Sequence, residues 1–136
     1  MLLRTHLAIA VLAILLFIPH ISGAFGKFAF VAVALIACLM PDIDTMYSSV
    51  GKFKLFRIFQ FFIKHRGVLH SFTFCIFLSL VFAFFIPILA LPFFLGYSLH
   101  LFGDAFTQEG IMPFWPLRIR TEWHLRTGSL IETNLF

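Results

Sequence analysis

Four apolar runs, each close to the length that crosses a membrane, dominate this chain of 136 residues. A membrane-spanning helix needs about 20 predominantly apolar residues. A proline follows directly after each of the first three runs, and Pro92 within the fourth predicts a kink. The runs cover residues 2–18, 25–40, 68–86 and 88–106. The pattern predicts an all-α polytopic membrane protein with four transmembrane helices, forming a single domain over residues 1–136.

Charged side chains are too scarce for a soluble domain. They make up 12% of the chain, and 61% of the residues are hydrophobic, whereas soluble domains average about 25% charged residues. This composition excludes a soluble globular domain, a disordered chain and a disulfide scaffold. The basic residues are separated by large apolar ones, so we expect no nucleic-acid partner. Nothing in the sequence specifies the oligomeric state.

Two segments outside the runs are expected to lie at the membrane surface. Residues 52–64 place Arg57, Gln60 and Lys64 on one helical face among phenylalanines and isoleucines, which predicts an interfacial amphipathic helix. A re-entrant or short buried helix is the alternative. The tail 107–136 carries Trp115, Pro116 and Trp123 among charges and is expected to form an interfacial cap. For the first run the alternative is a cleaved signal peptide, because residues 22–24 resemble a cleavage site.

The basic residues indicate the orientation. With four spans, the N-terminus, the central connection and the C-terminal tail lie on one side. That side carries nine basic residues: Arg4, Lys52, Lys54, Arg57, Lys64, Arg66, Arg118, Arg120 and Arg126. The other side carries only Lys27. Because basic residues concentrate in cytoplasmic loops, we predict an integral inner or plasma membrane protein with both termini on the cytoplasmic side.

Seven ionisable residues fall at the cytoplasmic ends of the predicted spans, although nearly the whole chain separates the first from the last. Ionisable residues at membrane depth are costly and are candidates for function. They are His6, Asp42, Asp44, His65, His70, His100 and Asp104. The four-span topology therefore predicts one polar cluster on the cytoplasmic side.

Local spacing suits metal binding. His100 and Asp104 are four residues apart and share a helical face. Asp42 and Asp44 point the same way if the chain is extended there. Gly67 lets the chain turn, so that His65 and His70 can both face inward. A hydrogen-bonded pair joining two helices is the alternative for His100 and Asp104.

The mixture of histidine and aspartate ligands indicates a divalent metal, with Zn²⁺ favoured and Mn²⁺ or Fe²⁺ as alternatives. Seven ligands exceed what one tetrahedral ion needs, so one or two ions are expected, in the second case sharing a bridging carboxylate. His20 and His124 lie elsewhere and are interpreted as interfacial anchors.

Three motifs resemble one known family. Residues 41–44 read Pro-Asp-Ile-Asp, residues 65–71 read His-Arg-Gly-Val-Leu-His-Ser, and Gly96-Tyr97 precedes the His100/Asp104 pair. With His6, Gly110, residues 113–116 and residues 127–129, they resemble the LexA-regulated, YdjM-like family of membrane-bound metal-dependent hydrolases over nearly the whole chain. Many relatives have histidine where this chain has Thr45, so one further ligand is absent here. By analogy, zinc-dependent phospholipase C also uses a helical His-x-x-x-Asp pair.

The resemblance implies hydrolysis, which metal-activated water would carry out. Because a site at headgroup depth would receive membrane-resident substrates laterally, a phospholipid or other lipid phosphodiester is the expected substrate. Asp42 or Asp44 would bridge the ions or orient the water, and Arg66 could hold an anionic group. Ser71 is interpreted as a hydrogen bonder behind the ligands or as a helix-end residue, and Glu132 is left outside the site. Three alternatives stay open: a lipid ester or amide hydrolase, a non-catalytic bundle pinned by its metal, and a metal transporter.

Overall fold

The computed structural model describes residues 3–44, 67–107, 110–117 and 119–121, without the side chain of Asp44. This part of the chain contains four α-helices and two short 3-10 helices, and it contains no strand. Among the described residues, one isolated antiparallel β-bridge joins Ile111 to Thr121. The all-α class predicted from the apolar runs is confirmed.

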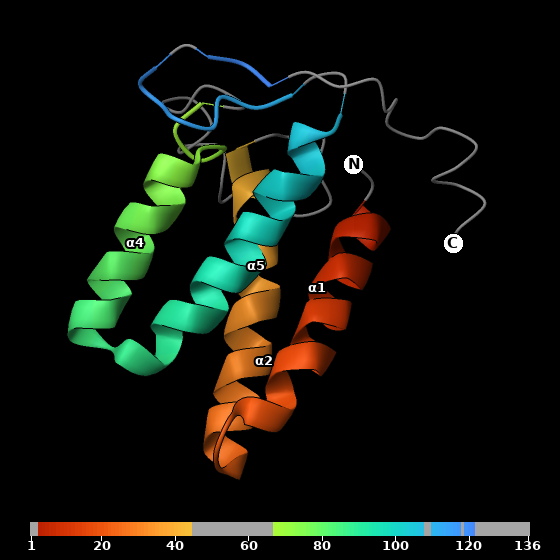
Figure 1. Cartoon of the computed structure of the whole chain (residues 1–136), viewed down its shortest axis with the longest axis vertical. Coiled ribbons are helices and arrows are strands. Elements are labelled where there is room, and N and C mark those ends of the chain that lie inside the picture. The colour runs from red at the N-terminus through yellow and green to blue at the C-terminus, as the bar shows by residue number, and fades with distance from the viewer. Residues whose placement is uncertain (1–2, 45–66, 108–109, 118, 122–136) are drawn as a thin grey trace.

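The helices form two hairpins that stand side by side (Figure 1). The first hairpin joins α1 to α2, the second joins α4 to α5, and α2 packs along α5 in the middle of the bundle. The bounds are α1 Leu3–Phe17, η1 Ile18–His20, α2 Ala24–Leu39, η2 Pro41–Asp44, α4 Phe72–Phe85 and α5 Pro87–Ala105. Each helix matches one predicted span, and Pro92 lies inside α5 without ending it.

The third predicted span begins too early in the chain. Residues 68–71 form a turn, and α4 starts only at Phe72. The cause is Ser71, whose hydroxyl oxygen accepts a hydrogen bond from the Phe74 N–H at 3.2 Å and so caps the helix. The helix-end interpretation of Ser71 is therefore confirmed. The apolar character of Val68 and Leu69 made this turn look like part of the span.

The extended conformation predicted at Asp42 and Asp44 is also wrong. Met40 at the end of α2 keeps helical dihedral angles, and residues Pro41–Asp44 continue as a 3-10 helix. Proline is tolerated there because the first N–H groups of a helix need no partner within it. A 3-10 helix has about three residues per turn, so the argument that both aspartates share a face does not hold.

The two hairpins meet through small residues. Gly96 of α5 lies against the backbone of Ala34 in α2, and a Cβ built on Gly96 would come within 2.0 Å of the Ala34 carbonyl oxygen. Ala37 of α2 and Tyr97 and Leu101 of α5 continue the buried contact toward the end of the bundle that carries the predicted ligands. This close approach of α2 and α5 positions the residues at their ends.

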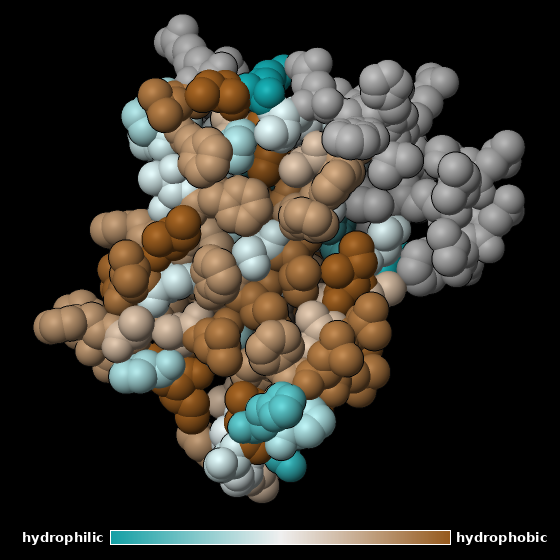
Figure 2. Space-filling view, in the orientation of Figure 1, coloured by the Kyte–Doolittle hydropathy of each residue, from teal (hydrophilic) through white to brown (hydrophobic). Residues whose placement is uncertain are grey.

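The surface supports a membrane environment. Large apolar side chains are exposed on all four helices, among them Leu12, Phe28, Phe84 and Phe102, and apolar residues cover most of the visible helical surface (Figure 2). Leu3–His20 and Pro87–Ala105 are long and apolar enough to cross a membrane, while α2 and α4 have 16 and 14 residues.

Several predictions concern residues outside the described part of the chain. These are the amphipathic helix 52–64, the site residues His65 and Arg66, the end of the tail 122–136, and with it Glu132. They stay predictions.

Candidate metal centre

Four separate elements bring polar side chains to one end of the bundle. His6 comes from the first turns of α1, and Asp42 comes from η2, directly after α2. His70 ends the turn before α4, and His100 and Asp104 lie on the last two turns of α5. Five of the seven residues predicted as ligands therefore meet here.

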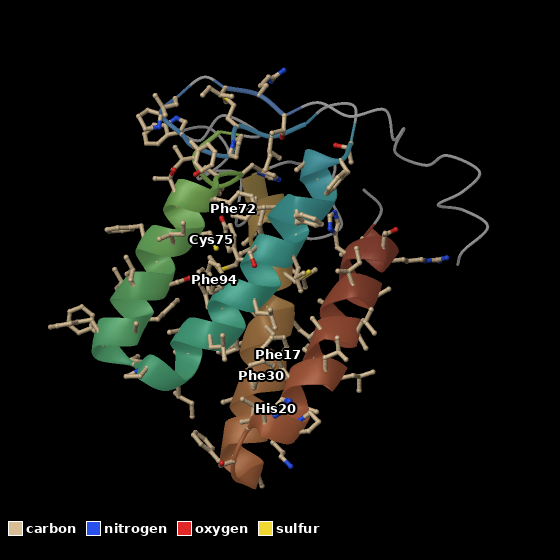
Figure 3. All side chains as sticks on the ribbon, in the orientation of Figure 1. Phe17, His20, Phe30, Phe72, Cys75 and Phe94 are labelled. Carbon is tan, nitrogen blue, oxygen red and sulfur yellow. The ribbon has the colours of Figure 1, made fainter. Side chains whose placement is uncertain are left out.

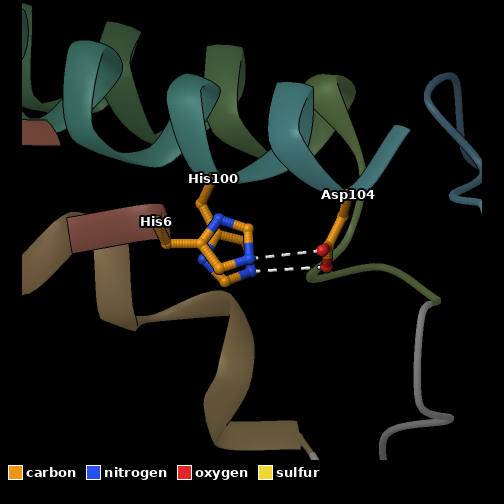
Figure 4. Close-up of side chains that lie close together, drawn as sticks. All are labelled: His6, His100 and Asp104. Carbon is orange, nitrogen blue, oxygen red and sulfur yellow. Dashed lines mark ion pairs between the residues drawn. The ribbon is translucent and has the colours of Figure 1, made fainter. Parts of the chain in front are cut away.

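The carboxylate of Asp104 lies close to three histidines of the cluster. Its Oδ1 lies 3.3 Å from His6 Nε2, and its Oδ2 lies 3.5 Å from His100 Nε2 and 3.6 Å from His70 Nε2. Figure 4 shows the imidazoles of His6 and His100 turned toward this one carboxylate. A second carboxylate is near His100, since Asp42 Oδ1 lies 3.7 Å from His100 Nε2. Three histidines from three elements thus surround a single aspartate.

The imidazole rings pack closely. His6 and His100 are stacked, with ring centroids 4.0 Å apart and planes 13° from parallel. The ring of His70 meets that of His100 edge-on at 5.7 Å. Stacking aligns the Nε2 atoms of His6 and His100 side by side (Figure 4). Both Nε2 atoms therefore lie beside the same carboxylate.

Three nitrogens in this cluster have unusual surroundings. Within the described residues, His6 Nδ1, His100 Nδ1 and His100 Nε2 are buried without a hydrogen-bond partner. Leaving a buried polar atom unpaired costs about 1–3 kcal/mol, and such atoms are uncommon in native structures. Coordination of a cation through Nε2 would remove the penalty at His100. The unpaired nitrogen is therefore an observation in favour of a metal.

The separations also fit a metal. Nitrogen and oxygen ligands at 2.0–2.1 Å from a tetrahedral ion lie about 3.3–3.4 Å from one another. The four separations between histidine Nε2 atoms and aspartate oxygens, 3.3 to 3.7 Å, are close to that value. In two sets of three residues, one ligand atom from each residue lies within 4.8 Å of the others: His6, His100 and Asp104, and Asp42, His70 and His100. His100 belongs to both, so the residues suit one ion or two adjacent ions.

Burial is uneven across the cluster. The side chains of His6, His70, His100 and Asp104 are at most 4% exposed, whereas that of Asp42 is 20% exposed. Among the described residues, Asp42 is thus the ligand through which the cluster reaches the surface.

Hydrogen bonds outside the ligand set hold these elements in place. The buried hydroxyl of Tyr97 donates to the Leu69 carbonyl at 2.6 Å and ties the turn that carries His70 to α5. The Ser71 hydroxyl donates to the Val68 carbonyl at 2.6 Å and stiffens the same turn. Phe72 N–H donates to the Pro113 carbonyl at 2.8 Å, which attaches the tail to the start of α4.

Sequence reasoning missed two contacts near the site, one made by Tyr97 and one made by Cys38. Tyr97 lies in the motif with His100, but nothing in its spacing points to Leu69, which lies 28 residues earlier. Cys38 is buried as expected for a small apolar residue, and its thiol lies 3.6 Å from the His6 carbonyl oxygen. Both native cysteines are free thiols. The signal available for Tyr97 was a hydroxyl within a mainly apolar run.

The other predicted residues divide into two groups. Asp44 lies in η2, but its side chain is not described, and His65 and Arg66 lie outside the described residues. His20, interpreted as an anchor, is exposed and lies at the opposite end of the bundle (Figure 3).

Comparison with known proteins identifies the family. The chain is 29% identical over 103 residues to the "Uncharacterized protein YvsG" of Bacillus subtilis (strain 168), a match covering 71% of this chain and 64% of the relative. No solved structure matches. Regulation by LexA, part of the resemblance seen in the motifs, stays a prediction. The family model described as "YdjM inner membrane protein" matches residues 1–136, and the chain therefore belongs to the YdjM family of inner membrane proteins.

Proposed function

We propose that this protein is a membrane-bound metal-dependent hydrolase that acts on a membrane-resident lipid phosphodiester. The observation that carries the proposal is the cluster of three histidines and two aspartates, with buried imidazole nitrogens left unpaired. His6, His100 and Asp104 would hold one ion, and Asp42 and His70 with His100 would hold the second or complete the first. Zn²⁺ suits this donor set best, and Mn²⁺ or Fe²⁺ are alternatives.

A bound divalent ion would acidify a coordinated water and polarise a phosphoryl or carbonyl oxygen. The residues of the chain supply the rest. Asp104 sits between three imidazoles, so it would hold the ion together with their Nε2 atoms and offset the positive charge of the ion. Asp42 is the exposed ligand and would accept a proton from the attacking water. Asp44 and Arg66 keep their proposed roles in orienting water and binding an anionic group.

We also propose how the four helices are oriented in the membrane. The four helices would insert with the cluster end at the cytoplasmic surface, because nine of the ten basic residues belong to segments predicted at that end. Lys27 and His20, both exposed, belong to the other end. A cluster at headgroup depth would receive its substrate laterally from the membrane. Lipid esters and amides are alternative substrates, since the same water could attack carbon.

A non-catalytic role has support of its own. Structural metal sites are closed, whereas catalytic ones keep an open position, and four of the five ligands are at most 4% exposed. The second candidate function is therefore structural: a bound ion would hold the ends of the helices together and would catalyse no reaction. The exposure of Asp42 favours the hydrolase.

One assay separates the two candidates. Purified protein in lipid nanodiscs is incubated with phospholipids and lipid esters, with and without a chelator. We expect hydrolysis that the chelator abolishes, and a loss of at least about 100-fold in His100→Ala, because metal ligands are less replaceable than their supports. His20→Ala, an exposed histidine at the far end, is the matched control and should retain activity. Metal-loaded protein that hydrolyses none of these lipids supports the pinned bundle, and hydrolysis that survives chelation contradicts the mechanism.

A further inference from the structure

The turn between α4 and α5 is made entirely of apolar residues. Only Ile86 separates the two helices, and residues 80–95 include no polar side chain. The tip is not packed inside the protein either, because Phe84 is 82% and Phe85 72% exposed. Exposed apolar clusters of this kind are rare on water-facing surfaces.

The backbone at this tip is satisfied without water. The Ile86 N–H donates to the Phe82 carbonyl at 2.7 Å, and the Ile86 carbonyl accepts from the Leu89 N–H at 2.9 Å. Pro87 has no N–H to satisfy. The only non-helical residue of the turn therefore has both of its backbone groups paired. Hydrocarbon demands such internal pairing, since it offers no hydrogen-bond partner.

The turn between α1 and α2 has the opposite character. It contains the exposed residues His20, Ser22 and Gly23, and Lys27 is exposed in the first turn of α2. Gly23 adopts a positive φ of 71° to reverse the chain. Figure 3 labels His20 at this end of the molecule, and the space-filling view shows hydrophilic atoms there but mostly apolar ones around the α4–α5 tip (Figure 2). This turn is built for water or headgroups.

Helix α4 is the shortest of the four helices, although its partner α5, with 19 residues, is the longest. Helix α4 has 14 residues, which at 1.5 Å per residue gives about 21 Å, whereas the hydrocarbon core of a bilayer is about 30 Å thick. Along the longest axis of the molecule, the α4–α5 tip ends well before the α1–α2 turn, and α5 is inclined to that axis (Figure 1). With the metal cluster at one surface, the tip falls short of the other.

We propose that α4 and α5 form a re-entrant hairpin whose tip ends inside the hydrocarbon core and contacts lipid acyl chains. The first hairpin alone reaches the far surface. This refines the four-span topology and rests on the membrane position proposed above, with the cluster end at one surface, but it does not depend on metal binding or on hydrolysis. The tip residues Phe84, Phe85 and Ile86 are the surface that the acyl chains cover.

Cysteine labelling in nanodiscs tests the proposal, since a water-soluble, membrane-impermeant maleimide reaches both faces of the bilayer there. Ala83→Cys and Phe85→Cys probe the tip, and Ser22→Cys is the matched control at the other turn. Wild-type protein is the blank, because Cys38 and Cys75 are buried. We expect the tip cysteines to react at least about tenfold more slowly than Ser22→Cys, because thiols in hydrocarbon stay protonated and beyond the reagent. All should react after denaturation in SDS.

A nitroxide attached to the same cysteines gives depth directly. At the tip we expect collisions with oxygen, which concentrates in hydrocarbon, to exceed those with a water-soluble nickel complex, and the reverse at position 22. Ala83→Cys is the smaller substitution and keeps the test valid if Phe85→Cys does not fold. Labelling of the tip as fast as of Ser22→Cys, or a dominant effect of the nickel complex at the tip, would overturn the proposal.

Discussion

Replacing Gly96 with alanine should separate the two hairpins. The added Cβ would lie 2.0 Å from the Ala34 carbonyl oxygen and 2.8 Å from the carbonyl carbon. Carbon and oxygen atoms in close contact normally keep about 3.3 Å, so α2 and α5 must move apart by about 1.3 Å. Both obstructing atoms belong to the backbone, and no side-chain rotation relieves the clash.

The expected cost combines two opposing effects. Overpacking a well-filled core costs about 1–3 kcal/mol and occasionally more, while alanine gains about 1 kcal/mol over glycine inside a helix. A rigid backbone clash belongs at the upper end of the first range. We therefore expect Gly96→Ala to lower the free energy of unfolding by about 2 kcal/mol.

Reversible unfolding in mixed detergent and SDS micelles measures this loss, and Gly26→Ala is the matched control. Gly26 also lies in a helix, but its added Cβ would meet only the flexible Cγ2 of Ile21, at 3.3 Å. The control should be neutral or stabilised. Because Gly96 lies one turn before His100, the movement should also lengthen the 3.7 Å separation of His100 and Asp42 and weaken metal binding. A Gly96→Ala protein as stable as the wild type would refute the reasoning.

Three further predictions concern the supports of the site. Tyr97→Phe removes the hydroxyl that donates to the Leu69 carbonyl, so we expect it to lower the free energy of unfolding by about 1–2 kcal/mol. Because the turn that carries His70 would shift, isothermal titration should also show weaker metal binding. An unchanged metal affinity would contradict the role of Tyr97 in positioning His70. Ser71→Ala removes the N-cap of α4 and should cost about 1 kcal/mol in the same unfolding assay, whereas Ser71→Thr should restore most of it. If the ion is present at 100 times its dissociation constant, removing it with a chelator should lower the free energy of unfolding by about 2.7 kcal/mol. An identical melting temperature with and without chelator would show that no ion links the helices.

The sequence was sufficient for the large features of the fold. The apolar runs and the prolines after them predicted all four helices to within a few residues, because hydrocarbon admits little else. The convergence of His6, His70, His100 and Asp104 followed from their positions at helix ends, since antiparallel helices bring alternate ends together. Neither inference needed a side-chain contact.

Finer geometry depended on interactions that no pattern exposed. The start of α4 depended on the N-cap that Ser71 provides. The residues before it are apolar enough to resemble part of a membrane-spanning segment. The conformation of Asp42 depended on Met40 keeping helical angles, so the chain ran on into a 3-10 helix. Tyr97 could not be assigned because its partner is a carbonyl group distant in sequence. The close contact of Gly96 with Ala34 likewise became visible only when the helices were in place.

The central claim is that a metal ion occupies the cluster formed at the ends of the four helices. Elemental analysis of protein purified in nanodiscs, compared among wild type, His100→Ala and His20→Ala, tests it most directly. His100 belongs to both ligand sets and His20 lies at the far end of the bundle. We expect one or two transition-metal ions per chain in wild type and His20→Ala, and a loss of most of that metal in His100→Ala. Folded wild-type protein that takes up no divalent metal, or a His100→Ala variant that keeps its full complement, would contradict it.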